Sequence, residues 1–89
     1  MSDVFIALQA NEESRYIVEA LLIDNPTAVV DEQPAMVKIN VPHQLVLKRE
    51  TMEEVIGRPY DLQEMQINLI TLSGHVDEDE DEFRLAWND

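Results

Sequence analysis

The sequence predicts a single small α+β domain in which a mostly antiparallel sheet packs against helices. Three observations support this class. A segment near the start has apolar residues at helical spacing, whereas most other apolar segments are short and several alternate with polar residues, as half-buried strands do. The chain has 89 residues, enough for one domain with one core. We expect the element order β-α-β-β-α-β-β and one domain spanning residues 1–89.

The first two elements are expected to be a strand and a helix. Val4–Leu8 is a short apolar run, typical of an edge or first strand. The helix is expected to begin at Asn11, a preferred N-cap residue, with Glu12 and Glu13 at the positive end of its dipole. It should stop at Asn25-Pro26, because proline cannot continue a helix. The apolar residues at helical spacing are Ile17, Val18, Leu21 and Leu22.

Short strands are expected in the middle of the chain. Residues 28–31 are rich in β-branched side chains, which favour strands. Residues 37–41 alternate between apolar and polar side chains, the pattern of a half-buried strand. A turn at Pro42-His43 leads to a further short strand over residues 45–47.

The second helix is predicted by a capping box. Thr51 is followed three residues later by Glu54, so the helix should begin at Thr51 and end at Gly57. Asp61 is expected to cap one more helical turn, which runs to Met65. The apolar residues within 66–73 fit both the helical and the strand period, and the β-branched content of this segment favours a strand. The alternating segment 83–87 is the expected last strand.

Composition excludes several function classes. The chain has 19 acidic and 6 basic residues, a formal net charge of -13, which argues against nucleic acids and anionic membranes as partners. It has no cysteine, so disulfides, thiolate metal sites and a thiol nucleophile are excluded. There is no secretory signal and no run of about 18 apolar residues, so we expect a cytoplasmic protein.

No motif indicates catalysis or a metal site. The acidic run 77–82 matches the first, third and fifth positions of a calcium loop, but Glu82 and Asn88 occupy the positions that require Gly and Glu. A solvated hairpin loop, kept open by repulsion between its carboxylates, is the favoured interpretation. An acidic patch that meets a basic partner is the alternative. Neither histidine has another at ligand spacing, and no serine has a Gly-x-Ser-x-Gly context.

One long segment resembles a known family. Residues 51–74, TMEEVIGRPYDLQEMQINLITLSG, closely resemble the effector (coupling or regulatory) proteins of bacterial multicomponent di-iron monooxygenases, and most of all the phenol hydroxylase effector component. Residues 5–15, 24–26 and 76–83 agree. The resemblance covers essentially the whole chain, so residues 1–89 are identified as a single monooxygenase effector domain.

The resemblance implies a regulatory role and no catalysis. Such proteins carry no cofactor. They bind a hydroxylase oligomer that holds a di-iron centre, and they modulate O₂ activation, substrate access and the coupling of NADH use to aromatic hydroxylation. The ferredoxin and reductase components are functional partners. Some relatives that act on methane or toluene have longer N-terminal extensions, whereas only Met1–Asp3 precede the first strand here, so a mechanism that needs a long tail is not expected.

The expected hydroxylase-binding residues lie at two places, and both rest on the resemblance and on polar character at element ends. They are Asn11, Glu12, Ser14 and Arg15 at the start of the first helix, and Gly57, Arg58, Pro59 and Asp61 after the second. Asn11 and Asp61 are equally expected to be helix caps and nothing more. The alternative function is an acidic interaction module, for instance a nucleic-acid mimic that inhibits a basic partner. Its affinity would depend on residues 77–82 and collapse with salt.

Overall fold

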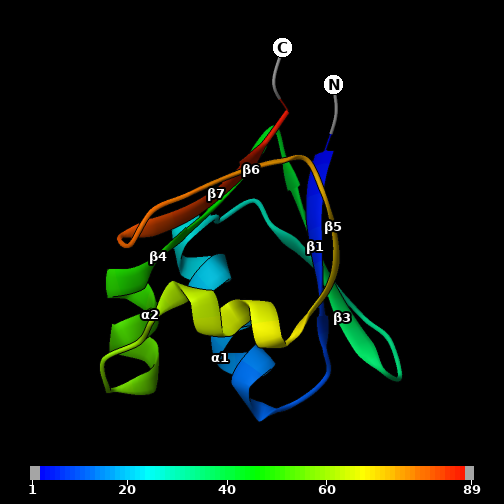
Figure 1. Ribbon diagram of the computed structural model, residues 1–89. Coiled ribbons are helices and arrows are strands. Elements are labelled where there is room, and N and C mark those ends of the chain that lie inside the picture. Colours follow the sequence, from blue (N-terminus) through cyan, green and yellow to red (C-terminus); the bar gives the residue numbers. More distant parts are fainter. Residues whose placement is uncertain (1–2, 88–89) are drawn as a thin grey trace.

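The computed structural model describes residues 3–87 and confirms the α+β class (Figure 1). Met1, Ser2 and Asn88, which enter the expectations above, lie outside these residues. The elements are β1 (Asp3–Gln9), α1 (Glu12–Asp24), β2 (Val29–Glu32), β3 (Met36–Pro42), β4 (Gln44–Lys48), α2 (Arg49–Ile56), the 3₁₀ helix η1 (Leu62–Ile67), β5 (Leu69–Ser73), β6 (His75–Glu78) and β7 (Glu82–Ala86).

The strands form two antiparallel sheets where the sequence predicted one. The expected order β-α-β-β-α-β-β is also wrong, because three strands lie between α1 and α2 and three follow η1. Sheet A has the order β2-β3-β1-β5, and sheet B has the order β4-β7-β6. β1 is therefore an interior strand and not an edge, because β3 and β5 pair with its two sides. In Figure 1 sheet A stands on the right, sheet B lies at the upper left, and the helices close the space below sheet B.

The chain passes between the sheets at two turns with unusual backbone geometry. His43, between β3 and β4, has φ 69°, and Gly74, between β5 and β6, has φ 137°. A Cβ atom on Gly74 would lie 2.9 Å from Cγ of Leu85 and 3.1 Å from Cγ1 of Val4. Both the backbone angle and the lack of space therefore require glycine at this crossing.

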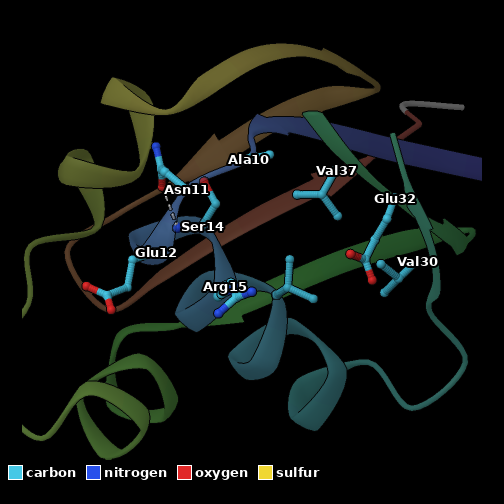
Figure 2. A pocket seen from close by; sticks show the side chains of 9 residues that line it. Ala10, Asn11, Glu12, Ser14, Arg15, Val30, Glu32 and Val37 are labelled. Carbon is cyan, nitrogen blue, oxygen red and sulfur yellow. Dashed lines mark hydrogen bonds between the residues drawn. The ribbon is translucent and has the colours of Figure 1, made fainter. Parts of the chain in front are cut away.

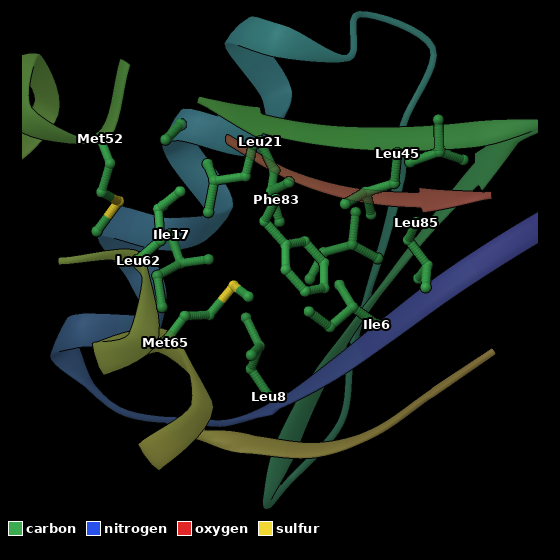
Figure 3. Close-up of a cluster of buried hydrophobic side chains, with 14 of the residues drawn as sticks. Ile6, Leu8, Ile17, Leu21, Leu45, Met52, Leu62, Met65, Phe83 and Leu85 are labelled. Atoms are coloured by element: carbon green, nitrogen blue, oxygen red, sulfur yellow. The ribbon is translucent and has the colours of Figure 1, made fainter. Parts of the chain in front are cut away.

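The core lies where the two sheets and the helices meet. Figure 3 shows Phe83 of sheet B among side chains that come from α1 and from β1. Ile17, Leu21, Ile6 and Leu8 are fully buried there. Burying one such side chain contributes roughly 1.5–3 kcal/mol. Met52, Leu62 and Met65 close the side of the core formed by α2 and η1.

α1 begins and ends where the sequence predicts. Asn11 is the N-cap residue, and its Oδ1 accepts a hydrogen bond from the Ser14 N–H at 2.9 Å. At the other end the Asn25 N–H donates to the Leu21 carbonyl at 2.8 Å, and Pro26 follows. α1 has 13 residues. Among residues 3–87 no helix has the length and apolar character needed to cross a membrane.

Asn25 also holds the end of α1 to sheet B. Its buried side chain donates from Nδ2 to the carbonyls of Leu21 and Val46 at 2.8 and 2.7 Å, and its Oδ1 accepts the Val46 N–H at 2.9 Å. The amide thus pairs with both backbone groups of Val46, as a neighbouring strand would. This pairing covers part of the outer edge of β4.

The predicted capping box of the second helix is wrong. α2 begins at Arg49, two residues before Thr51, and the N-cap residue is Lys48, whose side chain forms no capping bond. The cap comes from Asp24 in the last turn of α1. Its Oδ2 accepts the Lys48 N–H at 2.9 Å, and its Oδ1 accepts the Thr51 hydroxyl at 2.8 Å. A carboxylate from a distant part of the chain therefore replaces the local one.

The segment after α2 follows the prediction with one shift. Gly57 ends α2 in the left-handed conformation, with φ 75°. Asp61 caps η1 in a capping box with Glu64. The predicted turn continues to Ile67, so Gln66 and Ile67 belong to η1 and the following strand is shorter than predicted.

The acidic run 77–82 forms a closed hairpin and not an open loop. Its first two residues belong to β6, a strand that was not predicted and that pairs with β7. Oδ1 of Asp79 accepts the backbone N–H groups of Asp81 and Glu82 at 2.8 and 2.9 Å. Arg49 pairs with Asp81 at 3.1 Å. The run is mostly exposed, as expected, but hydrogen bonds define its shape.

The hairpin turn is expected to respond to acid through Asp79. The N–H groups of Asp81 and Glu82 hold the pKa of Asp79 below its ordinary value of 3.8, because they bind the ionised carboxylate. Asp79 therefore stabilises the fold above pH 3.8, and this contribution disappears as the pH falls through the lower pKa of the folded state. The difference in Tm between wild type and Asp79→Ala should be constant near neutral pH and shrink below this value in thermal melts.

The control for this measurement is Asp77→Ala in β6. It removes the same charge, but the Asp77 carboxylate accepts no hydrogen bond from any residue between 3 and 87. An equally large and equally pH-dependent change in Tm for Asp77→Ala would contradict the assignment of the effect to the Asp79 turn.

Candidate functional site

Seven of the eight expected binding residues line three grooves, of which the first and second share Glu12 and the second and third share Tyr60. The first groove, with a volume of about 500 Å³, lies between the start of α1 and the strands β2 and β3 (Figure 2). Apolar side chains from α1, β2 and β3 lie beside charged ones in this groove. Its lining residues are Ala10, Asn11, Glu12, Ser14, Arg15, Val18, Val30, Glu32 and Val37.

The second groove, of about 330 Å³, brings the start of α1 together with the end of α2. Glu12 lines both the first and the second groove, and Arg58 lines the second. Glu12 and Arg58, which are 46 positions apart in the sequence, thus line the same groove. Its lining residues are Glu12, Glu13, Tyr16, Met52, Ile56, Arg58 and Tyr60.

The third groove, of about 450 Å³, continues from the second because Tyr60 lines both. Pro59 and Asp61 are the expected residues that line it. Gly57 is the one expected residue that lines none of the three grooves. The lining residues of the third groove are Arg49, Glu53, Pro59, Tyr60, Asp61, Glu64 and Glu80. We call the combined lining of the three grooves the docking face.

The expected residues differ in how freely they meet solvent. Glu12, Arg15 and Arg58 are exposed and available for contact. Arg58 donates from Nη1 to the Pro59 carbonyl at 3.0 Å. Ser14 is only 1% exposed, and its hydroxyl has no hydrogen-bond partner among residues 3–87. Ser14 therefore lies beneath the surface.

Tyr60 is a central residue of the docking face that the sequence did not reveal. It is 4% exposed, its N–H donates to Oε2 of Glu53 at 2.9 Å, and its hydroxyl donates to Oε2 of Glu13 at 3.4 Å. Burial, together with Glu13 and Glu64, raises the pKa of the Tyr60 phenol far above its ordinary value of 10.0. The hydroxyl therefore stays protonated and remains a donor at neutral pH.

Asn68 is the second residue that the sequence did not reveal. It is 5% exposed, and its Oδ1 accepts a hydrogen bond of 2.6 Å from Nδ2 of Asn11. Its backbone carbonyl accepts the Gln9 N–H at 2.8 Å. The partners are 57 residues apart, so no local pattern predicts the pair.

Among residues 3–87 no three His, Asp or Glu side chains lie close enough together to hold a metal ion.

Comparison with known proteins places this fold in a family. The model of the MmoB/DmpM family matches residues 2–86. The chain is 51% identical over 84 residues to the stimulatory component DmpM of phenol 2-monooxygenase from Pseudomonas sp. (strain CF600), which covers 94% of this chain and 93% of that protein.

Solved structures agree with this match. A chain of a phenol hydroxylase–regulatory protein complex superposes with a TM-score of 0.93 at 53% identity, covering 98% of this chain and 100% of that one. Regulatory protein B of soluble methane monooxygenase shares the fold, with a TM-score of 0.75 at 16% identity, and covers 97% of this chain and 65% of that one. The family match over residues 2–86 and the identity of 51% together show that this chain belongs to the MmoB/DmpM family.

Proposed function

We propose that this protein is the regulatory component of a phenol hydroxylase, which binds the hydroxylase and stimulates it without performing chemistry itself. The observation that carries the proposal is the identity of 51% to a phenol 2-monooxygenase stimulatory component over 94% of the chain. The TM-score of 0.93 to a chain of a phenol hydroxylase–regulatory protein complex supports it. On this proposal the chain is one cytoplasmic effector domain without a cofactor, and the hydroxylase oligomer holds the di-iron centre.

The proposed mechanism is a population shift. A protein that adds no chemical group can alter its partner only by binding one partner conformation more tightly than another. A preference of about 2–3 kcal/mol changes such an equilibrium roughly 30- to 150-fold. The favoured hydroxylase conformation would differ in substrate access and O₂ activation, and so in the product formed per NADH supplied through the ferredoxin and reductase components.

We propose that the docking face is the contact surface. It consists of grooves, and its exposed side chains include Arg15, Tyr16 and Arg58, residue types that are enriched at protein interfaces. Carboxylates outnumber arginines in its lining by seven to three, counting Glu12, Glu13, Glu32, Glu53, Asp61, Glu64 and Glu80 against Arg15, Arg49 and Arg58. A hydroxylase surface with an excess of basic groups would complement this lining and favour rapid association.

Reconstitution tests the function. Purified phenol-hydroxylase hydroxylase, ferredoxin and reductase are mixed with and without this protein, and product is measured against NADH consumed. We expect more product per NADH, and a faster rate, when the protein is present. Equal yields and rates with and without it, in an assay in which a known stimulatory component is active, would overturn the proposed function.

Two arginine variants test the contact surface in the same assay. Arg15→Ala and Arg58→Ala should each raise the protein concentration that gives half-maximal stimulation about 5- to 30-fold, roughly 1–2 kcal/mol, because each removes an exposed side chain of the docking face. Arg84→Ala is the matched control, since Arg84 lies on β7 outside the three grooves and, among residues 3–87, forms a salt bridge with Glu82 alone. Unchanged affinity and yield for both docking-face variants would place the contact elsewhere.

A further inference from the structure

We propose that two side-chain bridges, Asn11–Asn68 and Glu13–Tyr60, hold the start of α1 against the segment that follows α2, and that they set the affinity of the docking face for the hydroxylase. Asn11, Asn68 and Tyr60 are then positioning residues, which act through the shape of the face. The inference rests on the proposed function. On this inference Asn11 holds the docking face in shape, whereas the resemblance predicted that it contacts the hydroxylase.

Both the oxygen and the nitrogen of the Asn11 side-chain amide form hydrogen bonds. Its Oδ1 caps α1 by accepting the Ser14 N–H at 2.9 Å, and its Nδ2 donates to Oδ1 of Asn68 at 2.6 Å. Serine and aspartate also cap helices well, but neither has an amide NH₂ group that can span to Asn68 while its oxygen caps the helix. Asparagine at position 11 is therefore explained by the bridge and not by the cap alone.

The second bridge starts two residues further along α1, at Glu13, and crosses the second groove. The Tyr60 hydroxyl and Oε2 of Glu13 are 3.4 Å apart, at the long end of hydrogen-bond distance. Tyr60 is itself fixed, because it is buried and its N–H donates to Glu53 at 2.9 Å. Tyr60, which lines both the second and the third groove, thus provides a fixed hydrogen-bond partner for the first turn of α1.

The two bridges join the parts of the docking face that are far apart in sequence. Glu12 and Arg15 come from α1, whereas Arg58, Pro59 and Asp61 follow α2. If the two parts shift relative to one another, the hydroxylase meets a competent surface only part of the time. Apparent affinity falls in proportion to the competent fraction, whereas the stimulation reached at saturation does not change. The bridges should therefore affect half-saturation and leave the maximum unchanged.

The test uses Asn11→Ser, Asn68→Ala and Tyr60→Phe in the reconstituted hydroxylase assay. Asn11→Ser keeps a good helix cap and removes only the bridge. Each single variant should raise the half-saturating concentration about three- to tenfold, in line with the loss of one hydrogen bond, with unchanged maximal stimulation. Asn11→Ser combined with Asn68→Ala should be no worse than the more affected single variant, since both break one bridge.

A second readout needs no hydroxylase. Amide hydrogen exchange in residues 12–16 of the free protein should be faster in Asn11→Ser combined with Tyr60→Phe than in wild type, because the first turn of α1 opens more often. Asn40→Ser is the control for both readouts. Asn40 lies on β3, lines none of the three grooves and forms no side-chain hydrogen bond within residues 3–87.

The outcomes separate the inference from the function on which it rests. If wild type stimulates the hydroxylase and the bridge variants show wild-type half-saturation, the positioning role is overturned while the proposed function stands. A lowered maximum at unchanged half-saturation would also overturn it, because the residues would then act in activation and not in docking. If wild type itself gives no stimulation, the proposed function fails first.

Discussion

Replacing Gly74 with alanine is expected to lower the free energy of unfolding by about 3 kcal/mol. The new Cβ atom would lie 2.9 Å from Leu85 Cγ and 3.1 Å from Val4 Cγ1, and both of these side chains are fully buried. The backbone at φ 137° is also one that side chains rarely adopt. Urea denaturation followed by circular dichroism measures the loss. It should appear as a lower midpoint with little change in slope.

Gly57→Ala is the matched control, because it separates backbone conformation from packing. Gly57 has φ 75°, and a Cβ atom built there has no neighbour within 4 Å in the described part of the chain. Only the conformational cost applies, so we expect a loss of about 1 kcal/mol. Equal losses for the two variants would show that the crossing between the sheets is not as tightly packed as its geometry indicates.

Asn25→Ala is expected to cost about 2–3 kcal/mol, because it removes a buried amide that forms three side-chain hydrogen bonds. The N–H and the carbonyl of Val46 both lose their partner, and the last turn of α1 loses its link to β4. The exposed edge of β4 should also make the variant more prone to associate. Thermal denaturation gives the stability change, and analytical ultracentrifugation gives the association.

Asn40→Ala provides the comparison for Asn25. It removes the same amide from a half-buried position on β3 where the side chain forms no hydrogen bond within residues 3–87. We expect a change within about 0.5 kcal/mol. If Asn25→Ala were no more damaging than Asn40→Ala, the pairing of Asn25 with Val46 would contribute little to the fold.

Local signals in the sequence predicted local structure well. Asn11, Asn25-Pro26, Gly57 and Asp61 mark helix ends whose physical causes lie within a few residues, and each has the predicted role. The alternation in residues 37–41 predicted β3, where Val37, Ile39 and Val41 are buried. These features depend on backbone capping and on side-chain periodicity, both of which are readable along the chain.

The errors arose where a distant residue decides the structure. Thr51 looked like a cap because Glu54 follows it, but α2 begins two residues earlier, and a carboxylate of another helix, Asp24, accepts the hydrogen bonds of Lys48 N–H and the Thr51 hydroxyl. The acidic run looked like an open loop because repulsion is visible in sequence, whereas the pairing of β6 with β7 is not. The division into two sheets likewise depends on which strands pair, and strand periodicity carries no information about partners.

In the candidate site, too, the sequence predicted local features and missed those that depend on distant residues. The family resemblance and polar character at element ends selected positions 11, 12, 14 and 15 in one segment and 57, 58, 59 and 61 in another, and the structure brings the two segments together. They could not select Tyr60 or Asn68, because the hydrogen bonds on which their proposed role rests span 47 and 57 positions of the chain. Polar character also ranked Ser14 with the expected contact residues, although its side chain is buried.

The start of β1 and the end of β7 lie side by side, joined by a hydrogen bond of 3.1 Å from Nε1 of Trp87 to the Asp3 carbonyl. In Figure 1 this junction is at the top of the molecule, at the opposite end from the start of α1. A biotin or a surface linker attached beside Asp3 would therefore leave the docking face open to a hydroxylase in solution. Trp87, the single tryptophan of the chain, is 44% exposed and gives this junction its own fluorescence signal.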